Sequence, residues 1–195
     1  MAEYRWNKHE LAAGYDASAE YVHPHYLELQ DFLVRAIATL QPDASTAAPY
    51  VVDLGGGTGR LAEKILKALP AARVLVIDQA EPALEIARKR LAPFADRAAT
   101  AVSQLQGEWE QHLAEPPTAI VSMSAIHHLD PGEKEQLYRR CHAALASGGY
   151  FANGDEVRDP QPEIYLAQVA TWGKHMDRVM AAGLIAESFH DALHQ

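Results

Sequence analysis

Short apolar segments alternate with amphipathic segments along most of this chain, and that alternation restricts the folds it can adopt. Four apolar segments read YVVDL at 50–54, RVLVID at 73–78, RAATAV at 97–102 and TAIVSMS at 118–124, and a fifth lies within SGGYFANGDEV at 147–157. Apolar strands separated by helices are typical of a parallel sheet that is covered on both faces. We therefore predict an α/β fold with a doubly wound, mostly parallel sheet of about five strands.

Helical spacing of apolar residues predicts the helices that cover this sheet. The predicted helices span residues 25–40, 61–69, 82–92, 130–145 and 163–182. In the fourth, Asp130, Pro131 and Glu133 have the types expected of an N-cap, a first helical residue and a capping-box partner, and Cys141 faces the core. Residues 1–23 show little periodicity, and residues 41–49 read as a turn-rich linker.

Composition and charge exclude several classes of protein. The chain has 195 residues, enough for one domain, and a formal net charge of -9. Its densest basic runs, ARKR at 87–90 and YRR at 138–140, fall within predicted helices, so we predict no nucleic-acid partner. No apolar run approaches the roughly 20 residues of a membrane helix. With one cysteine and a polar N-terminus, the expectation is a cytoplasmic protein without a membrane partner.

Unusual polar residues lie where the predicted strands end. They are Asp53, Asp78, the segment 122–128 and Asp155. In doubly wound sheets the ligand binds outside the carboxyl ends of the strands, so these residues predict one shared site.

The segment VVDLGGGTGR at 51–60 places four glycines directly after the first strand. A dinucleotide fingerprint G-x-G-x-x-G starting at Gly55 would need a third glycine where Arg60 stands. A phosphate loop would need a lysine and a hydroxyl residue after Gly59. The pattern that fits is D-x-G-x-G-x-G, formed by Asp53, Gly55, Gly57 and Gly59.

This pattern resembles motif I of the class I S-adenosylmethionine-dependent methyltransferases. The stretch SMSAIHHLDPGEKEQLYRRCHAALASGGYF at 122–151 is also similar to that family, and the resemblance runs from about residue 15 to 157. It implies a Rossmann-like fold, S-adenosylmethionine as cofactor, and methyl transfer to a small-molecule acceptor. It also implies a single domain, 1–195, with an N-terminal lid at 1–24, a cofactor-binding core at 25–157 and a helical segment at 158–195.

The resemblance implies which residues contact the cofactor. The glycine loop passes under the methionine part, Asp53 lies near its amino group, and Asp78 accepts hydrogen bonds from the ribose hydroxyls. Many members carry an acidic residue after the third strand, where this chain has Ser103 and Gln104 instead. The implied cofactor-binding residues are Tyr15, Asp53, Gly55, Gly57, Asp78, Gln79, Ser103, Gln104 and Ser124.

His127 is the candidate catalytic residue. If the backbone is extended there, His127 and His128 point in opposite directions, so one faces the pocket while the other packs. A histidine with its ordinary pKa could act as general base for a hydroxyl or an amine. A hydrogen-bonded structural role remains the alternative. No zinc-ligand spacing accompanies His127, His128, Asp155 and Glu156, so we predict no metal.

Two other functions remain open from the sequence. The chain could be a cofactor-binding module without catalysis, or a nicotinamide-dependent oxidoreductase. The family's sheet has seven strands, whereas five are predicted here before Val157. Without the last two strands the fifth is an open edge, which predicts a homodimer or an aggregation-prone monomer.

Overall fold

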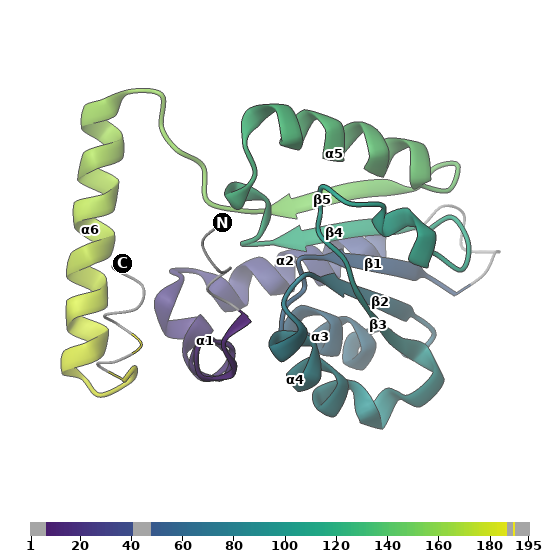
Figure 1. Ribbon diagram of the computed structural model, residues 1–195, viewed down its shortest axis with the longest axis horizontal. Coiled ribbons are helices and arrows are strands. Elements are labelled where there is room, and N and C mark those ends of the chain that lie inside the picture. The colour runs from purple at the N-terminus through teal and green to yellow at the C-terminus, as the bar shows by residue number, and fades with distance from the viewer. Residues whose placement is uncertain (1–6, 41–47, 187–188, 190–195) are drawn as a thin grey trace.

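The computed structural model describes residues 7–40, 48–186 and 189, and it confirms the predicted fold. Five parallel strands form one sheet in the order β3-β2-β1-β4-β5 (Figure 1). The strands are β1 (Tyr50–Leu54), β2 (Arg73–Asp78), β3 (Ala98–Val102), β4 (Ala119–Met123) and β5 (Tyr150–Gly154). Because β1 pairs with both β2 and β4, Asp53 lies opposite Val76 on one side and Val121 on the other.

Helices cover both faces of the sheet because neighbouring strand residues point to opposite sides. On one face, Val51 packs with α2 (Tyr26–Thr39), α3 (Arg60–Ala68) and α4 (Glu81–Leu91). On the other face, Val52 packs with Trp109 and with α5 (Pro131–Ala144). The predicted capping box opens α5, and Cys141 is buried as predicted.

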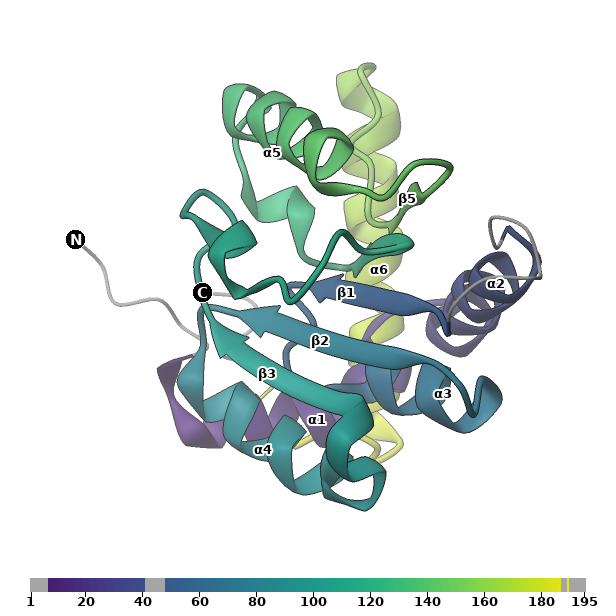
Figure 2. The ribbon, with the colours of Figure 1, turned by 90° about the vertical axis from the view of Figure 1, so that its right-hand side faces the viewer.

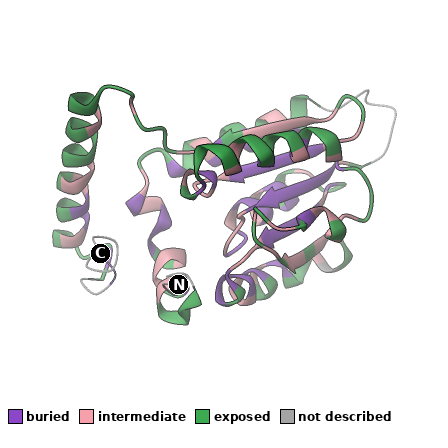
Figure 3. Cartoon of the chain, turned by 45° about the horizontal axis from the view of Figure 1, so that its top comes forward, coloured by how far each residue is buried: buried purple, intermediate pink, exposed green. Residues whose placement is uncertain are grey.

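Two helices form a third layer beside the sheet. They are α1 (His9–Val22) and α6 (Pro162–Ala181), which share a cluster that contains Val22, Met176 and Val179 (Figure 2). The sequence predicted little structure for the first 23 residues, so α1 corrects that prediction. Much of α6 is exposed (Figure 3), and its Val169 is 45% exposed. No helix in the described part of the chain is long and apolar enough to cross a bilayer.

Three short 3-10 helices, η2 (Ala92–Arg97), η3 (Trp109–His112) and η4 (Ile126–His128), complete the described elements. Helix η4 shows that the backbone at His127 and His128 is not extended, which was the condition for their side chains to point in opposite directions. Their ring centroids lie 4.0 Å apart, and both side chains face the same cavity. The predicted linker at 41–49 lies mostly outside the described residues.

Strand β5 pairs with β4 on one side, and no described strand pairs with its other edge. We therefore expect a dimer or an aggregation-prone monomer, to be distinguished by sedimentation. We expect the C-terminal segment to cover or pair with that edge. Phe189, the one residue described after Ala186, packs in the cluster of α1 and α6.

Hydrogen exchange of the β5 amides tests the pairing directly. In a dimer that pairs through this edge, we expect slow exchange along residues 150–157. Fast exchange in a well-behaved monomer would refute the pairing.

Candidate active site

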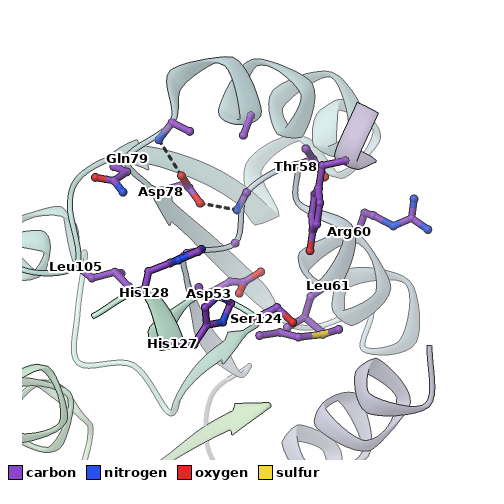
Figure 4. A pocket seen from close by; sticks show the side chains of 18 of the residues that line it. Asp53, Thr58, Arg60, Leu61, Asp78, Gln79, Leu105, Ser124, His127 and His128 are labelled. Carbon is purple, nitrogen blue, oxygen red and sulfur yellow. Dashed lines mark hydrogen bonds between the residues drawn. The ribbon is translucent and has the colours of Figure 1, made fainter. Parts of the chain in front are cut away.

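A cavity of about 450 Å³ lies at the carboxyl ends of β1, β2 and β4, where the strand order changes direction. The predicted site residues come together there, with one exception. Those that line the cavity are Tyr15, Asp53, Gly55, Gly57, Asp78, Gln79, Ser103, Ser124 and His127. Gln104 is not among the lining residues, whereas the neighbouring Leu105 and Gln106 are. Figure 4 shows Asp53, Asp78, His127 and His128 around this space.

The glycine loop follows β1 and forms the floor of the cavity. Gly55 and Gly57 have φ of +69° and +52°, which side chains rarely tolerate. A Cβ on Gly55 would overlap the Cβ of Ala125, so Gly55 is needed for packing. In the described part of the chain, a Cβ on Gly57 would meet only the Oδ2 of Asp78, 3.9 Å away. Gly57 therefore leaves space for a ligand to approach the backbone.

Asp78 ties the ends of β1 and β2 together. Its Oδ2 accepts a hydrogen bond from the Gly57 N–H at 2.9 Å, and its Oδ1 accepts one from the Ala80 N–H at 2.8 Å (Figure 4). Burial raises the pKa of Asp78, and these backbone N–H groups oppose that shift. Each oxygen keeps a second lone pair, so the carboxylate can accept further hydrogen bonds from a ligand.

Asp53 is the most unusual group in the cavity. It is 1% exposed, and neither carboxylate oxygen has a hydrogen-bond partner among the described residues. Burial, and then the charge of Asp78, raise its pKa to about 7. A buried carboxylate without a partner is costly, so its position favours a ligand that brings a donor or a positive charge.

Helix α1 is held against the glycine loop by Asp16. Its carboxylate accepts a hydrogen bond from the Thr58 hydroxyl at 2.7 Å and pairs with both terminal nitrogens of Arg90 at 2.9 Å. Burial alone would raise the pKa of Asp16, but the bonds from Arg90 and Thr58 hold it below its usual range. This contact brings Tyr15 to the cavity wall.

His127 is fixed by two acidic residues that follow β5. Its Nδ1 lies 2.6 Å from Oδ1 of Asp155 and 2.9 Å from Oε2 of Glu156, and its backbone N–H donates to Oδ2 of Asp155. The other Glu156 oxygen lies 2.8 Å from Nδ1 of His23, the residue after α1. Burial alone would lower the pKa of His127, but the bonds to Asp155 and Glu156 raise it to about 9.

This cluster also bears on the prediction that no metal is bound. Ligand atoms of His127, Asp155 and Glu156 lie within 4.8 Å of one another, so three of the four residues considered from the sequence do meet. His128 is not part of that group. The absence of a bound metal stays a prediction.

Sequence reasoning predicted Tyr15 but missed three other cavity residues from this part of the chain, His23, Tyr26 and Gln30. A signal for α1 was present, because Leu11, Tyr15, Ala19 and Val22 recur at spacings of three and four. For Gln30 there was no signal, because a glutamine on a helix is most often a solvated residue.

Comparison with known proteins identifies the family. The family described as "Methyltransferase domain" matches residues 52–151, just over half of the chain. An uncharacterized methyltransferase of Oceanobacillus iheyensis is 30% identical over 76% of this chain and 61% of its own length. The trans-aconitate 2-methyltransferase of Paracidovorax citrulli is 36% identical over 55% of this chain and 38% of its own. The chain thus spans less than two thirds of these relatives.

Two further matches define the limits of the likeness. The ribosomal RNA small subunit methyltransferase H of Mycobacterium avium is 43% identical, but only over 34% of this chain and 17% of its own. The crystal structure of DesVI from Streptomyces venezuelae covers 78% of this chain and 58% of its own, with a TM-score of 0.60 and 22% identity. At that identity the structural match supports the fold alone.

The fold and the cavity at its switch point define a Rossmann-like enzyme domain with a glycine loop that does not suit a phosphate. Together with the family match, they show that the chain belongs to the class I S-adenosylmethionine-dependent methyltransferases. The cofactor of this family is S-adenosylmethionine.

The residues present fit this cofactor. Its methionine end carries an ammonium group, which suits the unpartnered carboxylate of Asp53. Its ribose carries two hydroxyls, which suit the remaining lone pairs of Asp78. Gly57 leaves room beside both.

Asp78→Ala is expected to reduce cofactor affinity by about 1–3 kcal/mol, typical of losing a charge-assisted hydrogen bond at a buried site. The Gly57 and Ala80 N–H groups also lose their acceptor, so Asp78→Asn, which keeps an acceptor oxygen, should lose less. Calorimetry with S-adenosylhomocysteine measures both. An Asp78→Ala loss within error of zero would show that Asp78 does not contact the cofactor.

Proposed function

We propose that this protein transfers a methyl group from S-adenosylmethionine to a small-molecule acceptor. The resemblance and the family match support the reaction, and the nine predicted residues around one cavity support its location. When bound, S-adenosylmethionine supplies a methyl group on a positively charged sulfur, and the chain must align the acceptor with that methyl and exclude water. The first helix, held by Asp16, is the part of the predicted lid that would exclude it.

His127 is proposed to remove the proton that the acceptor loses. It lines the cavity, and Asp155 fixes its ring orientation through Nδ1. A histidine oriented by a carboxylate is a common form of general base. Because its pKa is raised to about 9, the ring is mostly protonated at neutral pH and would work best in alkaline solution.

The observation that favours a small acceptor is the pairing of the basic residues. In the run at 87–90, Arg88 pairs with Glu81 and Arg90 with Asp16. In the run at 138–140, Arg139 pairs with Glu135 and Arg140 with Glu110. These pairs offset most of the positive charge of the two densest basic runs, and with the net charge of -9 they disfavour binding to an RNA backbone. The RNA methyltransferase relative matches too little of the chain to outweigh this.

Formation of S-adenosylhomocysteine tests the proposal. We would offer the protein phenols, amines, thiols and carboxylic acids on one side and tRNA on the other. We expect turnover with at least one small molecule and no tRNA binding that falls steeply with salt. Tight, salt-sensitive tRNA binding in a filter assay would overturn the small-molecule assignment. No turnover with any acceptor would favour the alternative of a cofactor-binding module.

A further inference from the structure

Gln30 carries the second polar side chain in this cavity that is buried without a partner. The residue is 3% exposed, and its Nε2 has no hydrogen-bond partner among the described residues. It lines the same cavity as Asp53. An amide NH₂ group buried without an acceptor costs free energy, and a ligand that supplies the acceptor removes that cost.

The position of Gln30 relates it to the glycine loop. It lies one helical turn after Tyr26 on α2, so the two side chains share a face of that helix. Both line the cavity. Burial raises the pKa of the Tyr26 hydroxyl, and the charge of Asp53 contributes to that shift, so Tyr26 lies near Asp53. Gln30 therefore reaches the cavity on the side of Asp53.

The two unpartnered groups are complementary but do not bond each other. The Gln30 amide nitrogen can only donate, and the ionised Asp53 carboxylate can only accept. No hydrogen bond joins the two groups. A ligand that satisfies both must therefore offer an acceptor to Gln30 and a donor to Asp53. An α-amino acid group has both, as carboxylate and ammonium.

Arg60 is another donor that lines this cavity. Its Nη1 donates to the backbone oxygen of Asp16 at 2.7 Å, and its guanidinium lies 5.7 Å from the Tyr26 ring centroid. Those contacts already occupy part of Arg60, whereas the Gln30 amide nitrogen has none among the described residues.

We propose that Gln30 binds the α-carboxylate of the cofactor's methionine end, opposite the ammonium group that Asp53 binds. This inference rests on the proposed cofactor. In this proposal Gln30 recognises the amino-acid end of the cofactor and does not contact its nucleoside. Gln30 belongs to α2 and Asp53 to β1, so different elements recognise the carboxylate and the ammonium group.

The test compares two ligands that differ only in that end. S-adenosylhomocysteine carries the amino-acid group, and 5′-methylthioadenosine is the matching thioether without it. Gln30→Met removes the amide and keeps the side-chain length. By calorimetry, we expect its affinity for S-adenosylhomocysteine to fall about 10-fold or more, and its affinity for methylthioadenosine to stay within about twofold.

Thermal unfolding supplies a second readout that does not depend on activity. Because Gln30→Met removes an unpartnered buried donor, the ligand-free variant should unfold at the same or a higher temperature than wild type. Gln168→Met, the same change at an exposed position of α6, is the matched control and should alter neither affinity. If Gln30→Met fails to fold, Gln30→Glu replaces it, and its carboxylate should weaken S-adenosylhomocysteine binding selectively.

The outcomes separate this inference from the proposed function. Equal losses for both ligands, or no loss for either, would overturn the role of Gln30 and leave the cofactor assignment standing. A wild-type protein that binds methylthioadenosine no more weakly than S-adenosylhomocysteine would also overturn it. Failure of the wild type to bind either ligand would overturn both.

Discussion

Replacing Gly57 by valine is expected to abolish binding of S-adenosylmethionine and S-adenosylhomocysteine and to leave the fold intact. Among the described residues, and apart from its two chain neighbours, the only atom that a Cβ there would approach within 4 Å is Oδ2 of Asp78. The branched side chain would therefore extend into the cavity and occupy the space proposed for the methionine part. Calorimetry on the folded variant measures the effect, and an unchanged affinity would contradict the cofactor's placement.

The backbone strain of this substitution needs its own control. Gly57 has φ of +52°, where a β-branched residue costs about 1–2 kcal/mol. Gly183, after α6, has φ of +69°, no atom of the described residues lies within 4 Å of an added Cβ, and it does not line the cavity. Gly183→Val should show a similar loss of stability and normal cofactor affinity. Loss of binding in both variants would mean that strain, and not occupancy of the cavity, is responsible.

Replacing His127 by glutamine is expected to lower turnover about 10²–10⁴-fold, the usual contribution of a general base. Cofactor affinity should change little, because the proposed role of His127 is to remove a proton from the methyl acceptor and not to bind the cofactor. The rate of S-adenosylhomocysteine formation with an active acceptor measures this. Turnover within about twofold of wild type would show that His127 has a structural role.

The pH dependence of the same rate follows from the environment of His127. Only the neutral ring can accept a proton, so activity should rise with pH and level off above about 9. Asp155→Asn removes one of the charges that hold the proton, and should move the midpoint toward the ordinary value near 6.5. An NMR titration of His127 measures the midpoint in the wild type and in Asp155→Asn and needs no methyl acceptor. A midpoint near 6.5 in the wild type would contradict this account.

The same proton links His127 to stability. Folding raises its pKa from 6.5 to about 9, so the folded state binds the proton more tightly than the unfolded chain. The stabilisation is therefore complete below about pH 6.5 and is lost as the pH rises through 9.

The sheet and the glycine loop could be predicted because their signals are local. The strands are mostly apolar, and Val51 and Val52 are buried on opposite faces as a doubly covered sheet requires. The D-x-G-x-G-x-G pattern and Asp78 stand at strand ends, where the topology alone brings them together.

The rest of the site depends on contacts between distant segments. Glu156 meets His127 because β4 and β5 are neighbours, and it meets His23 because the end of α1 reaches the segment after β5. No spacing in the sequence indicates the contact with His23. The raised pKa of His127 arises from the same contacts. An extended backbone was the condition for opposite-facing His127 and His128 side chains, and it is not met because residues 126–128 form a 3-10 turn. The burial of Gln30 likewise follows from how α2 packs.

A thermal-shift comparison of three ligands tests the central claim most directly. S-adenosylmethionine and S-adenosylhomocysteine, each at about 100 times its dissociation constant, should raise the unfolding temperature by roughly 5–10 °C, whereas NAD should leave it unchanged. A shift with NAD and none with the two S-adenosyl ligands would contradict the account.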